Sequence, residues 1–241
     1  MNDLTATYED LQDRLPEVAV FGVGAIEQHG AHLPVGTDWI IACELSRRVA
    51  EKLDAFLVPA LPFSLSQCHG PTPGTVWLKP LTLAQVVEDV IVSVYQGGIK
   101  NIVVINCHGG NFILLDVIER LNRRFEDLCV VMPPESLASY KGIFSDDAPE
   151  VEVHAGEVET SLQLFLNPEC VRKDRVVDHV PTVGREFMDY AFLKQISSAG
   201  VWGRPSRGTV SKGRQYLERL VDAYVNYVRE ALDFCHSRRQ P

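Results

Sequence analysis

Short apolar runs alternate with longer amphipathic segments along most of this chain. Four of the runs have the length and composition of buried strands, at residues 18–24, 56–58, 102–105 and 128–132. Between them, apolar side chains recur at helical spacing, at residues 40–53, 82–97 and 112–125. This alternation predicts right-handed βαβ units, and therefore an α/β fold with a mainly parallel sheet. We expect one domain over residues 1–241, because such folds commonly reach this length undivided.

The remaining segments fall outside this alternation. Residues 4–15 predict a short helix at the start of the chain, and Thr82 is the expected N-cap of the second long helix. Residues 215–234 predict a long helix that packs on the core, with an oligomer contact as the alternative. The irregular region 171–207 contains several prolines and is a candidate contact to a neighbouring subunit.

The first polar cluster directly follows the apolar run at 18–24. It brings Glu27, His29, His32 and Asp38 into one short segment. Carboxylate oxygen and imidazole nitrogen together suit zinc, manganese or iron. Open α/β sheets place their active sites at the carboxyl ends of strands. The cluster therefore predicts a metal site, with an ordinary solvated loop as the alternative.

Two further segments carry the same residue types at strand or helix ends. His108 follows the run at 102–105. His154, Glu157 and Glu159 open an apolar helix, whose first turn offers free N–H groups and a positive dipole end. Three such coincidences favour one metal site over three unrelated loops.

Two residues near these segments have competing interpretations. Cys107 is either a nucleophile or soft ligand, or a small core residue beneath the metal loop, and the usual burial of free cysteine favours the core. His69 lies in a Pro- and Gly-rich loop at 62–80, whose length indicates a functional or a disordered segment. It is either a substrate contact or an ordinary surface histidine.

Three segments, EQHGAHLPVGTD, NCHGGN and HAGEVETS, resemble sequence blocks of the creatininase family. Weaker matches extend the resemblance from about residue 18 to residue 213, nearly the whole chain. The resemblance implies a metal-dependent hydrolase with two metal ions on a three-layer α/β/α sandwich. It also implies a homo-oligomer, because the family commonly forms homo-hexamers.

The resemblance implies four metal ligands: Glu27, His29, Asp38 and His108. Asp38 would bridge both ions. His154 matches the residue proposed as proton donor, and Glu159 matches a glutamate close to the metals. Glu157 would orient His154, act as a base, or only interact favourably with the helix dipole. His32 would donate a hydrogen bond to a carboxylate ligand.

The chain departs from creatininase immediately after His108. Creatininase has a tyrosine and a ligand glutamate at the next two positions, where this chain has Gly109 and Gly110. One protein ligand is therefore missing, with Glu159 or Glu157 as the candidate replacement. The tryptophans that close over creatinine lack counterparts as well, so we expect a family member other than creatininase.

These features predict an amidohydrolase that cleaves a C–N bond of a small amide or cyclic amide. A hydroxide activated by two divalent metal ions (Zn, Mn or Fe) would attack the carbonyl carbon, and His154 would protonate the leaving nitrogen. The wider family leaves two other reactions open, namely opening of an oxidised carbocycle of the keto-inositol type and maturation of a small peptide by a peptidase. A scaffold protein without activity is a third alternative, against which the intact ligands argue.

Charge and cysteine usage narrow the choice of partners and location. The formal net charge of −9 argues against a nucleic-acid ligand, which needs a basic face, so a small-molecule substrate is expected. No apolar run approaches the ~20 residues that span a bilayer, and the first five residues lack the pattern of a signal peptide. The six cysteines form no CxxC pair, which predicts free thiols in a reducing cytoplasm.

Overall fold

A four-stranded parallel sheet forms the centre of the computed structural model, which describes residues 3–238. In space the strands follow the order β2-β1-β3-β4, with bounds β1 Val18–Val23, β2 Phe56–Leu61, β3 Asn101–Asn106 and β4 Cys129–Val131. Each neighbouring pair is parallel, as predicted. Val18 lies opposite Asn101 and Val23 opposite Asn106, so the carboxyl ends of β1 and β3 coincide.

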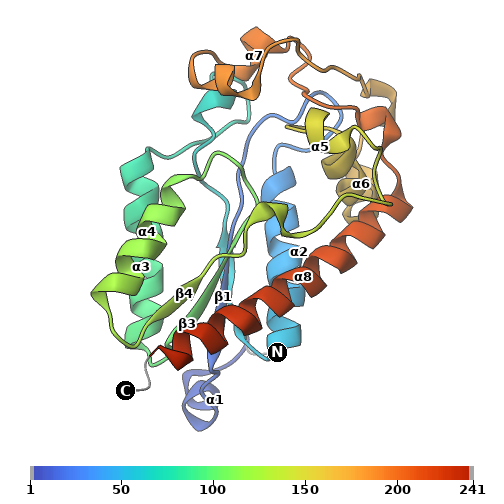
Figure 1. Cartoon of the computed structure of the whole chain (residues 1–241). Helices are drawn as coiled ribbons and strands as arrows, with labels where there is room; N and C mark the ends of the chain where they lie inside the picture. The colour runs from blue at the N-terminus through green and yellow to red at the C-terminus, as the bar shows by residue number, and fades with distance from the viewer. Residues whose placement is uncertain (1–2, 239–241) are drawn as a thin grey trace.

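Helices cover both faces of the sheet, α2 and α8 on one side and α3 and α4 on the other (Figure 1). Their bounds are α2 Thr37–Leu53, α3 Pro80–Gln96, α4 Ile113–Arg124 and α8 Val210–Ser237. Alternate residues of β1 supply two separate cores, because successive strand side chains point to opposite faces. Val18 and Val20 pack with α2 and α8, whereas Ala19 and Phe21 pack with α3 and α4. The predicted three-layer α/β/α sandwich is therefore confirmed.

Shorter elements connect these layers. The remaining α-helices are α1 Tyr8–Asp13, α5 Ala148–Val151, α6 Glu157–Leu166 and α7 Leu193–Ile196. Six 3₁₀ turns complete the described chain, namely η1 Gln67–His69, η2 Glu135–Leu137, η3 Pro168–Cys170, η4 Lys173–Arg175, η5 Arg185–Asp189 and η6 Pro205–Arg207. Most of these turns fall within or beside region 171–207, which is irregular as predicted.

Two helix starts differ from the sequence-based expectation. Thr82 is not an N-cap, because α3 already begins at Pro80, whose fixed φ suits the first helical position. Helix α8 begins at Val210, where the hydroxyl of Thr209 accepts a hydrogen bond from the backbone N–H of Lys212 (3.3 Å). The apolar face of α8 is buried in the core that it shares with α2, as predicted.

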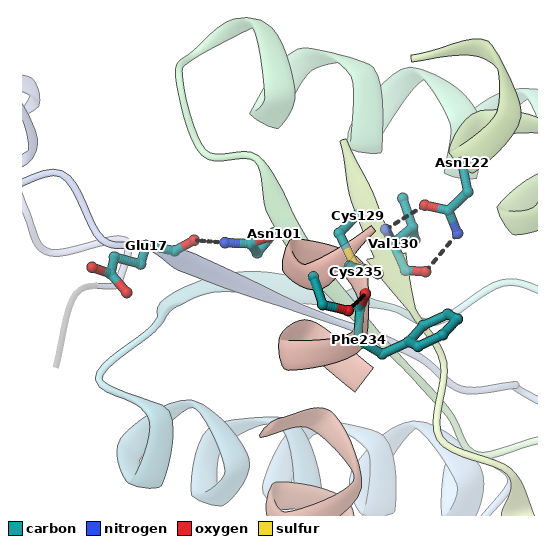
Figure 2. The surroundings of a disulfide bond; sticks show 8 residues. Glu17, Asn101, Asn122, Cys129, Val130, Phe234 and Cys235 are labelled. Atoms are coloured by element: carbon teal, nitrogen blue, oxygen red, sulfur yellow. Dashed lines mark hydrogen bonds between the residues drawn. A yellow bond between two sulfur atoms is a disulfide. The ribbon is translucent and has the colours of Figure 1, made fainter. Parts of the chain in front are cut away.

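A disulfide joins Cys129 of β4 to Cys235 near the end of α8, with 6.4 Å between the two Cα atoms (Figure 2). The expectation of free thiols at all six cysteines is therefore wrong for this pair. On the other side of β4, the amide of Asn122 from α4 pairs with the backbone of Val130, donating to its carbonyl (2.8 Å) and accepting from its N–H (2.7 Å). The edge strand is thus tied to a helix on each face.

No helix within residues 3–238 is long and apolar enough to cross a membrane. The expectation about a signal peptide rests partly on Met1 and Asn2, which lie outside the described residues.

Candidate metal centre

The predicted polar segments converge at the carboxyl ends of β1 and β3. The chain leaves β1 at Val23, passes Glu27 and His29, and enters α2 with Asp38 in the first turn. His108 follows the end of β3 by two residues. The start of α6 completes the group, so segments separated by more than 100 residues share one buried site.

Asp38 lies at the centre of the cluster. Its Oδ1 atom is 3.0 Å from Nε2 of His29, and its Oδ2 atom is 3.1 Å from Nδ1 of His108. All three side chains are buried. One carboxylate therefore faces two imidazoles from different elements, one with each oxygen.

Three groups of side chains are close enough to hold a metal ion. They are Glu27 with Asp38 and His108, His29 with Asp38 and Glu159, and Glu27 with His29 and His154. The first two groups share Asp38, so this carboxylate is in the position of a bridge. The prediction of Glu27, His29, Asp38, His108 and Glu159 as neighbours agrees with this geometry.

The donor chemistry of the cluster fits a divalent cation. Oε2 of Glu27 is buried and has no hydrogen-bond partner among the described residues. Burial raises the pKa of Glu27 to about 7, and the negative charge of Asp38 adds to this rise. A bound cation would compensate both the unpartnered oxygen and the crowding of carboxylates. Mixed oxygen and nitrogen donors admit zinc, manganese or iron.

The carboxylates and imidazoles perturb one another in the direction expected of close opposite charges. Burial opposes ionisation of Asp38, but His29 and His108 hold its pKa well below the usual value. Burial also opposes protonation of His29, yet Asp38 and Glu159 raise its pKa well above the usual value. Burial also opposes protonation of His108, but Glu27 and Asp38 outweigh it and raise the pKa of His108 to about 9.

The two candidate glutamates of α6 point in different directions. Oε1 of Glu159 lies 3.7 Å from Nε2 of His29, inside the cluster. The carboxylate of Glu157 is buried elsewhere, with Oε1 2.5 Å from Nζ of Lys212 and Oε2 accepting from the backbone N–H of Ser145 (3.3 Å). Glu157, predicted to act in catalysis, therefore does not reach the cluster. Its ion pair with Lys212 indicates a structural role.

His154 packs against two other histidines of the site. Its ring lies 4.2 Å from the ring of His29 and 4.3 Å from that of His69, centroid to centroid. Nε2 is 2.6 Å from the backbone carbonyl oxygen of Gln28, and Nδ1 is 3.6 Å from Oε1 of Glu27. Burial and the neighbouring His29 lower the pKa of His154 well below its usual value.

His32 does not join the cluster. Its Nε2 atom is 3.1 Å from Oγ1 of Thr160, and burial lowers its pKa to about 4. The predicted hydrogen bond from His32 to a carboxylate ligand is therefore not present, and the contact is with the residue that follows Glu159 instead.

Sequence reasoning missed the importance of Gln28 and left His69 undecided. His69 is buried at 2% exposure rather than on the surface, and burial lowers its pKa to about 3. Gln28 contacts both His69 and His154 with its side-chain nitrogen, at 3.2 Å in each case. Its place inside the first polar segment, directly between Glu27 and His29, was the available signal.

A cavity of about 510 Å³ opens onto the cluster. Its wall includes Glu27, Asp38, His69, His108, His154 and Glu159, and the turn η5 contributes Arg185, Glu186, Met188 and Asp189. Cys107 also lines the cavity, although it packs on the core beside α2 and α8 as predicted. The cavity is large enough for a small-molecule ligand.

The two glycines after His108 lie in the cavity wall. A Cβ atom on Gly110 would come within 2.5 Å of Nε2 of His108 and 2.8 Å of the carbonyl oxygen of Leu65. Because that oxygen lies 3.2 Å from the same Nε2 atom, the imidazole and the Leu65 backbone together fill the space of a side chain at position 110.

Comparisons with known proteins place the chain among hydrolases. Residues 4–228 match the family model described as creatininase, creatinine amidohydrolase. Creatinine amidohydrolase of Pseudomonas putida is 29% identical over 237 residues, covering 88% of this chain and 89% of the relative. Mycofactocin precursor peptide peptidase of Mycolicibacterium smegmatis is also 29% identical over 237 residues, covering 93% and 89%. A solved structure named creatininase Mn has a TM-score of 0.83 at 26% identity, covering 95% of this chain and 97% of that one.

Proposed function

The chain belongs to the creatininase family of hydrolases, and we propose that it cleaves a C–N bond of a small amide or cyclic amide at a centre of two divalent metal ions. The observation that carries this proposal is the position of Asp38, whose two oxygens face His29 and His108 separately. A carboxylate so placed can serve two ions at once, as two-metal hydrolases require.

The ligand set follows from the two groups that share Asp38. One ion would be held by Glu27, Asp38 and His108, and the other by His29, Asp38 and Glu159. When bound, such ions polarise a carbonyl oxygen and lower the pKa of water. Zinc, manganese and iron all suit these donors, and a creatininase structure that carries Mn in its name supports manganese as one of them.

His154 supplies the proton transfer. Nε2 of His154 lies 2.6 Å from the carbonyl oxygen of Gln28 and 3.2 Å from the side-chain nitrogen of the same residue. The shorter contact is to an acceptor, so this nitrogen carries the hydrogen and donates it to the carbonyl. The neutral ring therefore presents the lone pair of Nδ1 towards Glu27 and the cavity. His154 first accepts a proton from the attacking water at Nδ1, and then delivers it to the leaving nitrogen. Burial and the neighbouring His29 lower the pKa of His154, so the ring is neutral before the reaction begins.

The cavity favours a small substrate. Its volume of about 510 Å³ is within the range of small-molecule sites. A peptidase that acts on a small peptide is the second candidate, because the peptidase from Mycolicibacterium smegmatis is as similar to this chain as creatinine amidohydrolase is. The charged residues of η5 at the cavity wall are compatible with either substrate.

We also propose that the chain forms a homo-oligomer, with a hexamer expected from the family. Several large apolar side chains of the irregular region are exposed, among them Val183, Phe187, Tyr190 and Phe192. Large apolar side chains exposed along one segment are typical of a segment that contacts another protein. Because this region includes η5, the assembly would form beside the cavity, and light scattering of the purified protein measures its mass directly.

Metal content by plasma mass spectrometry tests the proposed centre. We expect about two zinc, manganese or iron ions per chain in protein purified without chelator, and none in Asp38→Ala. The loaded enzyme is then screened against amides, formamides, short peptides and keto-inositols. Two ions retained by Asp38→Ala would contradict the bridge, and a wild type that stays empty after reconstitution would contradict the metal-dependent mechanism.

A further inference from the structure

His69 lies between Gln28 and Glu27 in the wall of the metal centre. It comes from η1 in the long loop after β2, and no feature of that loop ties it to the predicted ligands. Its ring is nevertheless buried, with Nδ1 3.2 Å from Nε2 of Gln28 and Nε2 3.2 Å from Oε1 of Glu27. Both ring nitrogens are therefore within hydrogen-bonding distance of a protein atom.

The amide of Gln28 determines which nitrogen of His69 carries the hydrogen. Oε1 of Gln28 accepts a hydrogen bond from the backbone N–H of Gly30 at 3.1 Å, so the amide is oriented with its NH₂ group towards His69. Nδ1 of His69 must then accept from this donor. A neutral imidazole that accepts at Nδ1 carries its hydrogen on Nε2.

Nε2 of His69 consequently carries the hydrogen, and it lies 3.2 Å from Oε1 of Glu27. We propose that His69 is a positioning residue whose Nε2–H holds Oε1 of Glu27, so that the unpartnered Oε2 is presented to a metal ion. Metal-ligating carboxylates generally depend on such outer hydrogen bonds for their orientation. The inference rests on the proposed metal centre. It adds to that centre a series of side-chain contacts that runs from Gln28 through His69 to Glu27.

The other histidines near Glu27 do not substitute for His69. Nδ1 of His108 and Nδ1 of His154 approach the same Oε1 atom, but at 3.4 and 3.6 Å they are further away. His108 is itself expected to bind an ion, and His154 presents a lone pair rather than a hydrogen at Nδ1. Among these histidines, His69 is thus the one whose hydrogen is directed at Glu27. Its two engaged nitrogens also leave no lone pair for an ion of its own.

Metal affinity in two substituted proteins tests this role. His69→Gln keeps a side-chain N–H of similar reach, whereas His69→Leu keeps the bulk and removes the donor. His32→Leu is the matched control, because His32 is also buried but contacts Thr160 rather than a carboxylate. Each metal-free protein is titrated with Zn²⁺ and Mn²⁺ by competition with a chelating dye, and its thermal unfolding is recorded.

We expect His69→Leu to bind the ions about 10–100-fold more weakly than wild type, the usual effect of losing an outer hydrogen bond to a ligand. His69→Gln and His32→Leu should stay within a few-fold of wild type. Unchanged affinity in His69→Leu would overturn the role. Equal loss in His69→Gln and His69→Leu would overturn it too, because the imidazole itself would then be needed.

Nitrogen NMR of the metal-free wild type provides a test that does not depend on a substituted protein folding. The hydrogen of His69 should be found on Nε2, and its presence on Nδ1 would overturn the inference. Failure of the proposed function can be told apart from failure of this inference. A wild type that binds no ion contradicts both proposals. A wild type that binds two ions with an unaffected His69→Leu contradicts only this one.

Discussion

Nε2 of His154 lies 2.6 Å from the backbone carbonyl oxygen of Gln28, and this contact fixes the hydrogen of the ring on the side away from the metal centre. In the proposed mechanism, a histidine held in this way would start the reaction as a base and only later act as an acid. Because the partner is a backbone atom, substitution of the Gln28 side chain leaves this bond available.

Replacing His154 with Ala should leave the metal content unchanged and lower turnover by about 10²–10⁴, the usual range for one acid–base group. Turnover is measured on the best substrate from the amide screen, and metal content on the same samples. His32→Ala, another buried histidine, serves as the control for general damage. Loss of an ion in His154→Ala would instead identify this residue as a ligand, because it also lies within reach of Glu27 and His29.

The two glutamates at the start of α6 form a matched pair for substitution. Glu159→Gln should lose the ion shared with His29 and keep the other, since only Glu159 reaches the cluster. Glu157→Gln should keep both ions but lower the free energy of unfolding by about 1–3 kcal/mol, because Lys212 loses its buried partner. Metal analysis and urea unfolding of both proteins decide the assignment, and an exchange of the two outcomes would reverse it.

The disulfide should contribute measurably to stability. It closes a loop with a sequence separation of 106 residues, for which loss of a natural bridge costs about 2–4 kcal/mol. Cys235→Ser should therefore unfold at lower urea concentration than wild type without reductant, whereas Cys170→Ser should not. A peptide map without reductant locates the bridge directly. Equal stability of wild type with and without reductant would contradict a stabilising bridge. The cytoplasmic location of the protein stays a prediction.

Glu152 should make stability depend on pH. Burial raises its pKa to about 7, although its carboxylate accepts hydrogen bonds from the backbone N–H groups of Val158 and Arg204. A carboxyl group with a raised folded pKa stabilises the fold below its unfolded pKa near 4.5, and this contribution is lost as pH rises through about 7. Wild type should therefore lose up to about 3 kcal/mol between pH 4.5 and 8 relative to Glu152→Gln.

Urea unfolding of both metal-free proteins at several pH values measures this difference. The comparison within the pair removes the contribution of other titrating groups. Parallel stability curves for wild type and Glu152→Gln would show that Glu152 ionises normally in the folded protein.

The fold and most of the site could be predicted because both follow from regular periodicity. The apolar runs identified the strands, and in a parallel sheet the residues that follow β1 and β3 must meet at one edge. That rule brought Glu27, Asp38 and His108 together from sequence alone. The choice between Glu157 and Glu159 could not be made in the same way. Two residues of a helix differ by ~200° in direction, so only the packing of α6 decides which one faces the cluster.

Two features carry no periodic signal, so the place of His69 was left open and the disulfide was missed. His69 lies in a loop, where no rule of spacing fixes the direction of a side chain, and surface and buried positions were equally compatible with the sequence. The pairing of Cys129 with Cys235 depends on where α8 ends relative to β4, and connectivity between distant cysteines cannot be deduced from sequence.

The crowded surroundings of Gly110 bear on how this branch of the family can change. The glutamate that creatininase carries at this position cannot simply be restored, because its first side-chain carbon would collide with His108 and with the Leu65 backbone. A return to that ligand set requires the loop before η1 to move first. A single substitution at position 110 is therefore not enough to convert this centre into the other one, and such a change must also move the backbone around Leu65.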